Sequence, residues 1–195
     1  MEQKKTIGFV FIDQFADWEY GLLSGSAVEW FGARTIALSP STGPVRSIGG
    51  FRLMAERGTG VEENGDLDAI AVIGSDTWPS ADAPDIAPVL NATLARGGII
   101  GGICGGTLAL ARAGLFEGRK HTSNGAGWIE SKIGDYAGSS FYQDVPHAVR
   151  DAHIVSAPGS APGTFTTDFL EALFPESAGH VAEMRELIAR EYQAA

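Results

Sequence analysis

The chain has 195 residues, 44% of them hydrophobic, and this predicts one globular domain spanning residues 1–195. Its formal net charge of −10 disfavours phosphate backbones and anionic lipid, so we expect no nucleic-acid or membrane partner. Residues 1–5 lead into a short strand-like run, so we expect no signal peptide. No stretch reaches the roughly 20 apolar residues of a membrane span. A single cysteine excludes an internal disulfide, so we expect a cytoplasmic, reduced protein.

The first half of the chain alternates apolar runs with helical stretches. Nearly continuous apolar runs are typical of strands buried on both faces of a parallel sheet. Such strands are predicted at 6–12, 34–38, 69–73 and 99–103, with helices at about 18–30 and 85–96. Two short runs, 45–47 and 51–55, flank Gly49-Gly50 and predict a small β-hairpin.

The second half continues the alternation. We predict a helix from the end of the 99–103 strand to about Gly114, and then a short strand at 120–122. A helix at 124–133 follows, with Asn124 as its plausible N-cap. Strands at 148–150 and 153–156 and helices at about 164–173 and 177–192 complete the chain. The order predicts an α/β fold with a mainly parallel sheet covered on both faces.

The single cysteine lies in Gly102-Ile103-Cys104-Gly105-Gly106, between an apolar strand and a helical run. This arrangement has the form of a nucleophile elbow, a sharp turn that presents one side chain at the tip of a strand. Flanking glycines suit such a turn because a Cβ would clash where the backbone segments approach closely. The pattern therefore predicts reaction chemistry at the Cys104 sulfur, the alternative being a buried and inert cysteine.

The elbow and the residues after it support a family resemblance. The run Gly-Ile-Cys-Gly-Gly-Thr-Leu-Ala-Leu-Ala-Arg-Ala-Gly-Leu-Phe-Glu-Gly-Arg-Lys-His-Thr-Ser-Asn, residues 102–124, resembles the ThiJ/PfpI family. That family belongs to the class I glutamine amidotransferase-like superfamily and includes the parkinsonism-associated deglycase. The resemblance covers roughly residues 6–174. It implies a flavodoxin-like three-layer α/β/α sandwich, usually a homodimer, with a reactive cysteine at the elbow.

The resemblance also implies site residues. Cys104 matches the family nucleophile, and Glu19 matches the acidic residue that contacts it. Gly74 and Ser75 match a Gly-Gly pair whose backbone amide faces the reacting oxygen, with serine here in place of the second glycine. Many members carry histidine at the position of Asn124, and others place it directly after the cysteine, where this chain has Gly105. The identity of any general base is therefore open.

The residue types suggest how such a site would work. A thiol at a helix N-terminus meets unpaired N–H groups, so we expect the Cys104 pKa to lie below that of a free cysteine. A carboxylate touching a thiolate raises the pKa of both groups, so we expect a protonated Glu19 with a raised pKa. The alternative for Glu19 is a solvated residue in the first turn of its helix. The N–H groups of Gly105 and Ser75 would form the oxyanion hole.

Three further residues keep two interpretations each. His121 is either a proton shuttle or a packed histidine. Asn124 either holds substrate or caps its helix, the second being preferred. Trp78 either lines the pocket or belongs to the core or an interface. We expect no cofactor and no metal, since the i, i+3 pair His180 and Glu183 has no evident third ligand.

These observations lead to two functional hypotheses. The first is a cysteine-dependent enzyme acting on a small carbonyl or amide electrophile, with hydrolase, hydratase or glyoxalase- and deglycase-like chemistry all compatible. The alternative is a redox sensor or stress-response protein whose Cys104 is oxidised without substrate turnover. Because true glutamine amidotransferases use a late His-x-Glu pair that this chain lacks, glutaminase activity is not expected.

Overall fold

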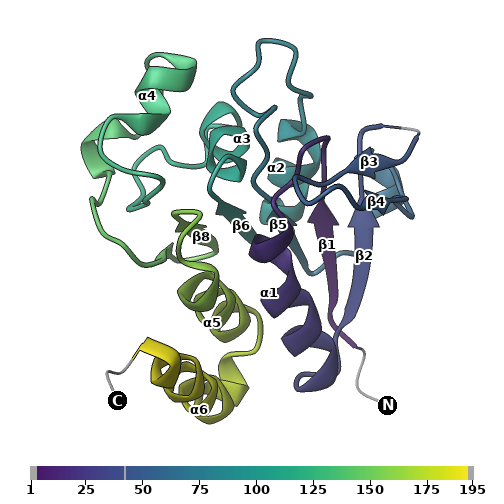
Figure 1. The fold of residues 1–195 in the computed structure, drawn as a ribbon, viewed down its shortest axis with the longest axis vertical. Coiled ribbons are helices and arrows are strands. Elements are labelled where there is room, and N and C mark those ends of the chain that lie inside the picture. The colour runs from purple at the N-terminus through teal and green to yellow at the C-terminus, as the bar shows by residue number, and fades with distance from the viewer. Residues whose placement is uncertain (1–3, 42, 193–195) are drawn as a thin grey trace.

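The computed structural model describes residues 4–41 and 43–192, which form a central six-stranded sheet flanked by helices (Figure 1). The strand order is β2-β1-β5-β6-β8-β7, and every neighbouring pair is parallel except β7 with β8. The bounds are β1 Thr6–Val10, β2 Arg34–Leu38, β5 Ala69–Val72, β6 Ile99–Ile103, β7 Val149–Asp151 and β8 Ile154–Ala157. The predicted α/β sandwich is confirmed.

Helices cover both faces of this sheet (Figure 1). On one face lie α1 (Asp17–Glu29) and α5 (Pro162–Leu173), with α6 (Ala178–Ala189) packed against α5. On the other lie α2 (Ala87–Ala95) and α3 (Gly106–Arg112), with α4 (Trp128–Ile133) packed against α3. Short 3-10 turns occur at Glu62–Asn64, Ser139–Phe141, Pro175–Ser177 and Arg190–Tyr192.

The apolar runs form strands because successive side chains enter two different cores. Ile7 and Phe9 face the core beneath α1 and α5, whereas Val10 faces the core beneath α2 and α3. Gly101 allows close approach in β6, since a Cβ there would lie 2.7 Å from the ring of Phe169. The paired cores hold β6 rigidly in the centre of the sheet, and the Cys104 elbow follows at its carboxyl end.

The predicted hairpin is confirmed as β3 (Val45–Arg46) paired antiparallel with β4 (Arg52–Leu53). Its turn is attached to the start of α1. The Gly49 amide donates a 2.7 Å hydrogen bond to the Asp17 carboxylate, and the Ile48 amide donates to the Phe15 carbonyl. Asp17 therefore joins the hairpin to α1, whose N-cap is Ala16.

The segment from 120 to 133 differs from prediction. Residues 120–122 form no regular strand, because His121 makes only an isolated bridge with Tyr142. The helix predicted at 124–133 begins at Trp128, and its N-cap is Gly127. Gly125 and Gly127 have φ values of 129° and 73°, and such backbone angles cannot continue a right-handed helix. Asn124 is thus outside the helix that it was expected to cap.

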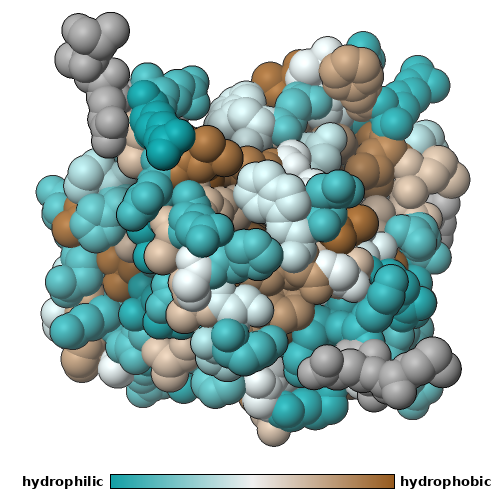
Figure 2. Space-filling model, turned by 90° about the horizontal axis from the view of Figure 1, so that it is seen from below, coloured by the Kyte–Doolittle hydropathy of each residue, from teal (hydrophilic) through white to brown (hydrophobic). Residues whose placement is uncertain are grey.

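The face seen from below in Figure 2 mixes hydrophobic residues with hydrophilic ones. None of the helices within 4–41 and 43–192 combines the length and the apolar character needed to cross a bilayer.

Candidate active site

Cys104 turns the chain sharply between β6 and α3. Its φ is 53°, in the left-handed region that residues other than glycine rarely adopt. This agrees with the sharp turn predicted from the sequence. The Cys104 amide donates a 2.9 Å hydrogen bond to the Ala157 carbonyl, which ties the turn to the end of β8. A Cβ at Gly105 would lie 2.7 Å from the Ser75 carbonyl oxygen, so the glycine is needed there. The thiol is partly exposed.

Glu19 lies in the first turn of α1 and is completely buried beside this thiol. Its Oε2 accepts a 2.7 Å hydrogen bond from the Gly74 amide. Its Oε1 accepts no hydrogen bond from the described residues. An added Cβ on Gly159 would lie 2.8 Å from the Cys104 Sγ and 3.1 Å from the Glu19 Oε1, so both atoms converge on one point. The alternative that Glu19 is a solvated residue in the first turn of its helix is therefore wrong.

Burial raises the pKa of both groups. Burial raises the pKa of Glu19 to about 7, against the lowering effect of the Gly74 amide. This agrees with the raised value expected from the sequence. Burial first, and then the Glu19 charge, raise the pKa of Cys104 to about 11. The expectation of a lowered thiol pKa is therefore wrong, because desolvation and the carboxylate outweigh the hydrogen bonds that Asn124 and Gly105 donate.

Asn124 contacts the sulfur and does not cap a helix. Its Nδ2 donates a 3.2 Å hydrogen bond to the Cys104 Sγ, and its Oδ1 accepts a 2.9 Å hydrogen bond from the Gly159 amide. Asn124 therefore takes a position that touches the reactive atom. An amide there donates a hydrogen bond to sulfur, but it does not accept a proton at neutral pH as an imidazole does.

The loop after β8 is part of the site, and sequence reasoning missed it. Gly159 covers the sulfur, and its carbonyl accepts a 3.0 Å hydrogen bond from the Trp18 indole at the start of α1. A usable signal was present in the sequence. Strands β6 and β8 are parallel neighbours, so the residues that follow them meet at one edge of the sheet. The glycine in Pro158-Gly159 marks the close approach.

The backbone amides expected to bind an oxyanion lie beside one another. The added Cβ on Gly105 would be 3.1 Å from the Ser75 nitrogen. Neither the Gly105 nor the Ser75 amide donates to a backbone carbonyl within the described residues. The Gly74 amide, by contrast, is occupied by Glu19 and is not available to substrate. The Ser75 hydroxyl bonds to the Asp13 carbonyl and to Thr77.

The structure places His121 in a packed environment. The side chain is fully buried and stacks on Phe116, with ring centroids 4.0 Å apart and an interplanar angle of 7°. Nδ1 pairs with the Arg119 carbonyl and Nε2 with the Tyr136 hydroxyl, so both ring nitrogens are engaged away from the sulfur. Burial lowers the pKa of His121 and keeps the ring neutral. The role of proton shuttle is therefore not supported.

Trp78 is also a core residue and not a pocket wall. It is fully buried, and its indole N–H donates a 2.8 Å hydrogen bond to the Ile73 carbonyl. Its ring packs against Gly105, since a Cβ added there would lie 3.3 Å from the Trp78 Cδ1. Within 4–41 and 43–192, no cluster of three or more His, Cys, Asp or Glu side chains is arranged to hold a metal ion.

The fold and this site define a three-layer α/β protein with a cysteine elbow. A family model described as the DJ-1/PfpI family matches residues 5–172. The chain belongs to this family, and the resemblance to ThiJ/PfpI proteins is confirmed.

Relatives and solved structures agree with this assignment. Two Bacillus subtilis (strain 168) proteins, named uncharacterized protease YoaZ and uncharacterized protease YdeA, are 31% and 32% identical to this chain. The matches cover 89% and 90% of this chain and 85% and 87% of those proteins. The crystal structure of the DJ-1 superfamily protein Atu0886 from Agrobacterium tumefaciens is 28% identical and has a TM-score of 0.86. The match covers 97% of this chain and all of that one.

Proposed function

We propose that the protein is a cysteine-dependent enzyme that acts on a small carbonyl or amide electrophile, with Cys104 as the nucleophile. Hydrolase, hydratase and glyoxalase- or deglycase-like reactions all begin with attack by such a thiolate. The observation that carries the proposal is the buried Glu19 carboxyl, with a pKa near neutrality, beside a partly exposed thiol. Catalytic acids and bases are commonly tuned to such values.

Glu19 supplies the proton acceptor in place of the histidine that many family members carry at the position of Asn124. Between about pH 7 and pH 11 the two groups together hold one proton. When that proton lies on Glu19, the sulfur is a thiolate that accepts hydrogen bonds from the Asn124 side chain and the Gly105 amide. Transfer from sulfur to carboxylate therefore activates the nucleophile without a third residue.

The first chemical step follows from this arrangement. The Cys104 Sγ forms a bond to the carbonyl carbon, the π electron pair moves to oxygen, and the thiol proton passes to Glu19. The Gly105 and Ser75 amides donate to the resulting oxyanion. With an aldehyde, Glu19 returns the proton to the oxyanion, and the product is a thiohemiacetal. With an amide, Glu19 returns the proton to the leaving nitrogen, and water then hydrolyses the thioester.

The surroundings of the sulfur favour a small substrate. Asn124 contacts the sulfur from one side, Gly159 covers it, and the Trp18 indole is bonded to the Gly159 carbonyl. The curated relatives are named uncharacterized proteases, and a peptide substrate would have to pass these residues. We therefore place small carbonyls and simple amides ahead of peptides.

The proposal is tested by turnover assays on three substrate groups: methylglyoxal, simple aliphatic amides and an unstructured peptide. We expect the wild type to convert one of the first two, and Cys104→Ser to lose this activity. Glu19→Gln is expected to reduce the rate by about 10²–10⁴-fold, the contribution typical of a general base. Glu29→Gln, on the exposed end of the same helix, is the matched control. Turnover that survives in Cys104→Ser contradicts the proposal.

A redox sensor is the second candidate, and one observation favours it. No histidine within the described residues hydrogen-bonds to the sulfur, whereas two amide donors do. Such donors also suit an oxidised sulfur, which carries acceptor oxygens. Peroxide titration followed by intact mass separates the candidates. Stepwise oxygen gain in the wild type but not in Cys104→Ser, without turnover of any substrate, favours the sensor.

We also propose that the protein forms a homodimer through the hairpin and the start of α1. Phe51 and Met54 are 73% and 65% exposed, and the neighbouring Trp18 and Ile48 are also exposed. Large apolar side chains gathered this closely are typical of interfaces. Sedimentation should show a dimer for the wild type and a monomer for Phe51→Asp. Leu187→Asp, on α6, is the matched control, and dissociation by that variant alone contradicts the proposal.

A further inference from the structure

Asn124 makes both of its side-chain hydrogen bonds within the site, yet it lies outside regular secondary structure. Its Nδ2 contacts the Cys104 sulfur and its Oδ1 contacts the Gly159 amide. The side chain is exposed, and the next residue, Gly125, has a φ of 129°. An exposed side chain on such a segment keeps one orientation only if something else holds its backbone.

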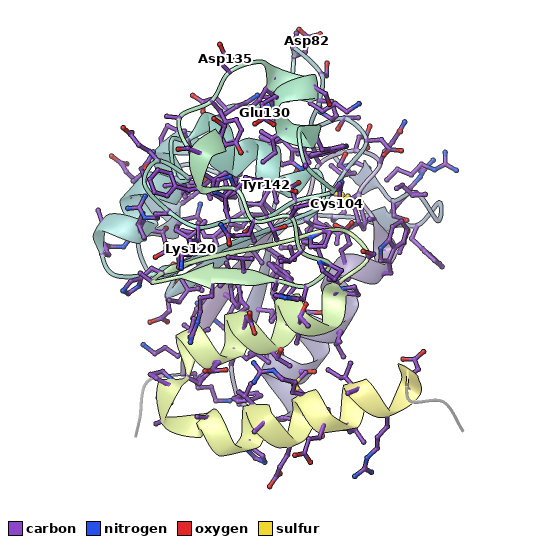
Figure 3. All side chains as sticks on the ribbon, turned by 90° about the vertical axis from the view of Figure 1, so that its left-hand side faces the viewer. Asp82, Cys104, Lys120, Glu130, Asp135 and Tyr142 are labelled. Atoms are coloured by element: carbon purple, nitrogen blue, oxygen red, sulfur yellow. The ribbon has the colours of Figure 1, made fainter. Side chains whose placement is uncertain are left out.

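Tyr142 provides that support from a distant part of the chain. Its hydroxyl oxygen accepts a 3.2 Å hydrogen bond from the Ser123 amide and a 3.1 Å hydrogen bond from the Gly125 amide. These are the two residues on either side of Asn124. One phenol oxygen therefore fixes the backbone on both flanks of the residue that touches the sulfur. In Figure 3, Tyr142 and Cys104 lie between α5 and the segment that carries Glu130 and Asp135.

A second anchor connects the same segment to the elbow. The Ser123 hydroxyl lies 2.6 Å from the Thr107 hydroxyl, which in turn donates to the Cys104 carbonyl. This anchor holds Ser123 only. On the Gly125 side, the Trp128 amide donates a 3.1 Å hydrogen bond to the Gly125 carbonyl, and the Tyr142 oxygen accepts from the Gly125 amide. Loss of the phenol oxygen therefore leaves the Gly125 amide without this partner and loosens that flank.

The packing behind Tyr142 explains the position of its hydroxyl. Its ring meets the His121 ring edge to face, with centroids 5.6 Å apart and an angle of 83°. The Gln143 amide also donates a 2.8 Å hydrogen bond to the His121 carbonyl. The His121 ring stacks on Phe116, and its Nε2 is hydrogen-bonded to the Tyr136 hydroxyl. The buried His121 ring therefore packs against the Tyr142 ring and fixes its position.

We propose that Tyr142 is a positioning residue, which holds Asn124 where it donates its hydrogen bond to the Cys104 sulfur. The inference deepens the proposed function, because it assigns a residue that prepares the same sulfur. Tyr142 does not touch the sulfur and acts only through Asn124. A hydrogen bond to a charged acceptor stabilises that acceptor, so a correctly placed Asn124 favours the thiolate.

The test measures the reactivity of Cys104 without any substrate. Alkylation by iodoacetamide is followed by intact mass as a function of pH, and the single cysteine makes the signal unambiguous. We expect Tyr142→Phe to raise the midpoint of the profile by about 0.5–1 pH unit, which is about 3–10-fold slower alkylation below the midpoint. Tyr20→Phe is the matched control, because the Tyr20 ring packs on Phe11 and Phe15 and not on the residues that support Asn124. Its midpoint should equal that of the wild type.

A double-mutant cycle establishes that Tyr142 acts through Asn124. Asn124→Ala should raise the midpoint at least as far as Tyr142→Phe, and the double variant should match Asn124→Ala alone. Additive shifts, or an unchanged midpoint in Tyr142→Phe, overturn the inference. Should Tyr142→Phe fail to fold, Asn124→Ala still decides, because an unchanged midpoint there leaves nothing for Tyr142 to position. Since alkylation needs no substrate, a failed turnover assay does not affect the result.

Discussion

The Glu19 carboxyl accepts a hydrogen bond from the Gly74 amide across 55 positions of sequence, at a distance of 2.7 Å. This contact joins the first turn of α1 to the loop after β5, and it places the second carboxyl oxygen beside the Cys104 sulfur. A buried carboxyl with one satisfied and one unsatisfied oxygen is costly to ionise. The contact therefore sets both the position and the proton affinity of the group that faces the nucleophile.

Replacing Glu19 should change the acidity of the thiol. Glu19→Gln removes the negative charge but retains the side-chain shape, so the pKa of Cys104 should fall from about 11 by about one unit or more. Thiolate ultraviolet absorbance as a function of pH measures this directly. Glu19→Leu removes the charge and also the acceptor for the Gly74 amide. A thiol pKa that is unchanged in Glu19→Gln contradicts the coupling described here.

The contribution of Glu19 to the stability of the fold should fall as the pH rises from 4.5 to 7. Its folded pKa of about 7 lies above the ordinary value of 4.5, so in this range the folded protein retains a proton that the unfolded chain releases. The loss is complete above pH 7 and amounts to about 3 kcal/mol at most. Urea unfolding of wild type and Glu19→Gln at pH 4 and pH 8 tests this. The free energy of unfolding of the wild type minus that of the variant should fall from pH 4 to pH 8, and a difference that is the same at both pH values would rule the effect out.

Gly105→Ala should disturb the elbow. The added Cβ would lie 2.7 Å from the Ser75 carbonyl oxygen, so backbone must move, and we expect a destabilisation of about 1–3 kcal/mol. The displaced Gly105 amide should also reduce turnover by about 10²–10³-fold. Gly21→Ala in α1 is the matched control, because its Cβ meets nothing within 4 Å and alanine favours the helix by about 0.5–1 kcal/mol. Equal stability of the two variants contradicts this account.

His121 should make the protein sensitive to acid. Burial lowers its pKa below the ordinary value of 6.5, so below that pH the unfolded chain binds a proton that the folded chain resists. The contribution of His121 to stability should therefore fall as the pH drops through and below about 6.5. His121→Gln should lose this dependence, whereas His153→Gln, an exposed histidine, should retain it. Thermal unfolding between pH 4.5 and pH 8 makes the comparison.

Much of the architecture could be predicted from local patterns. The runs around Ile7, Ile70 and Ile100 are strands because continuous apolar sequence satisfies a sheet buried on both faces. The elbow was visible because only a glycine frame tolerates the turn at Cys104. The segment around Asn124 was predicted wrongly because positive φ angles at Gly125 and Gly127 delay the helix to Trp128, and because the Tyr142 hydroxyl, distant in sequence, accepts hydrogen bonds from the amides on either side of Asn124.

The sequence alone determined that this chain is an α/β protein with one cysteine at a strand-to-helix turn, since periodicity and glycine spacing act over a few residues. The family came from the resemblance of residues 102–124 to ThiJ/PfpI proteins, which the family model confirms. Tertiary structure decided which groups surround that sulfur. Gly159 and Asn124 reach it because parallel strands end at one edge of the sheet, while His121 turns into the core. The raised proton affinity of Cys104 and Glu19 likewise comes from burial, which depends on everything packed around them.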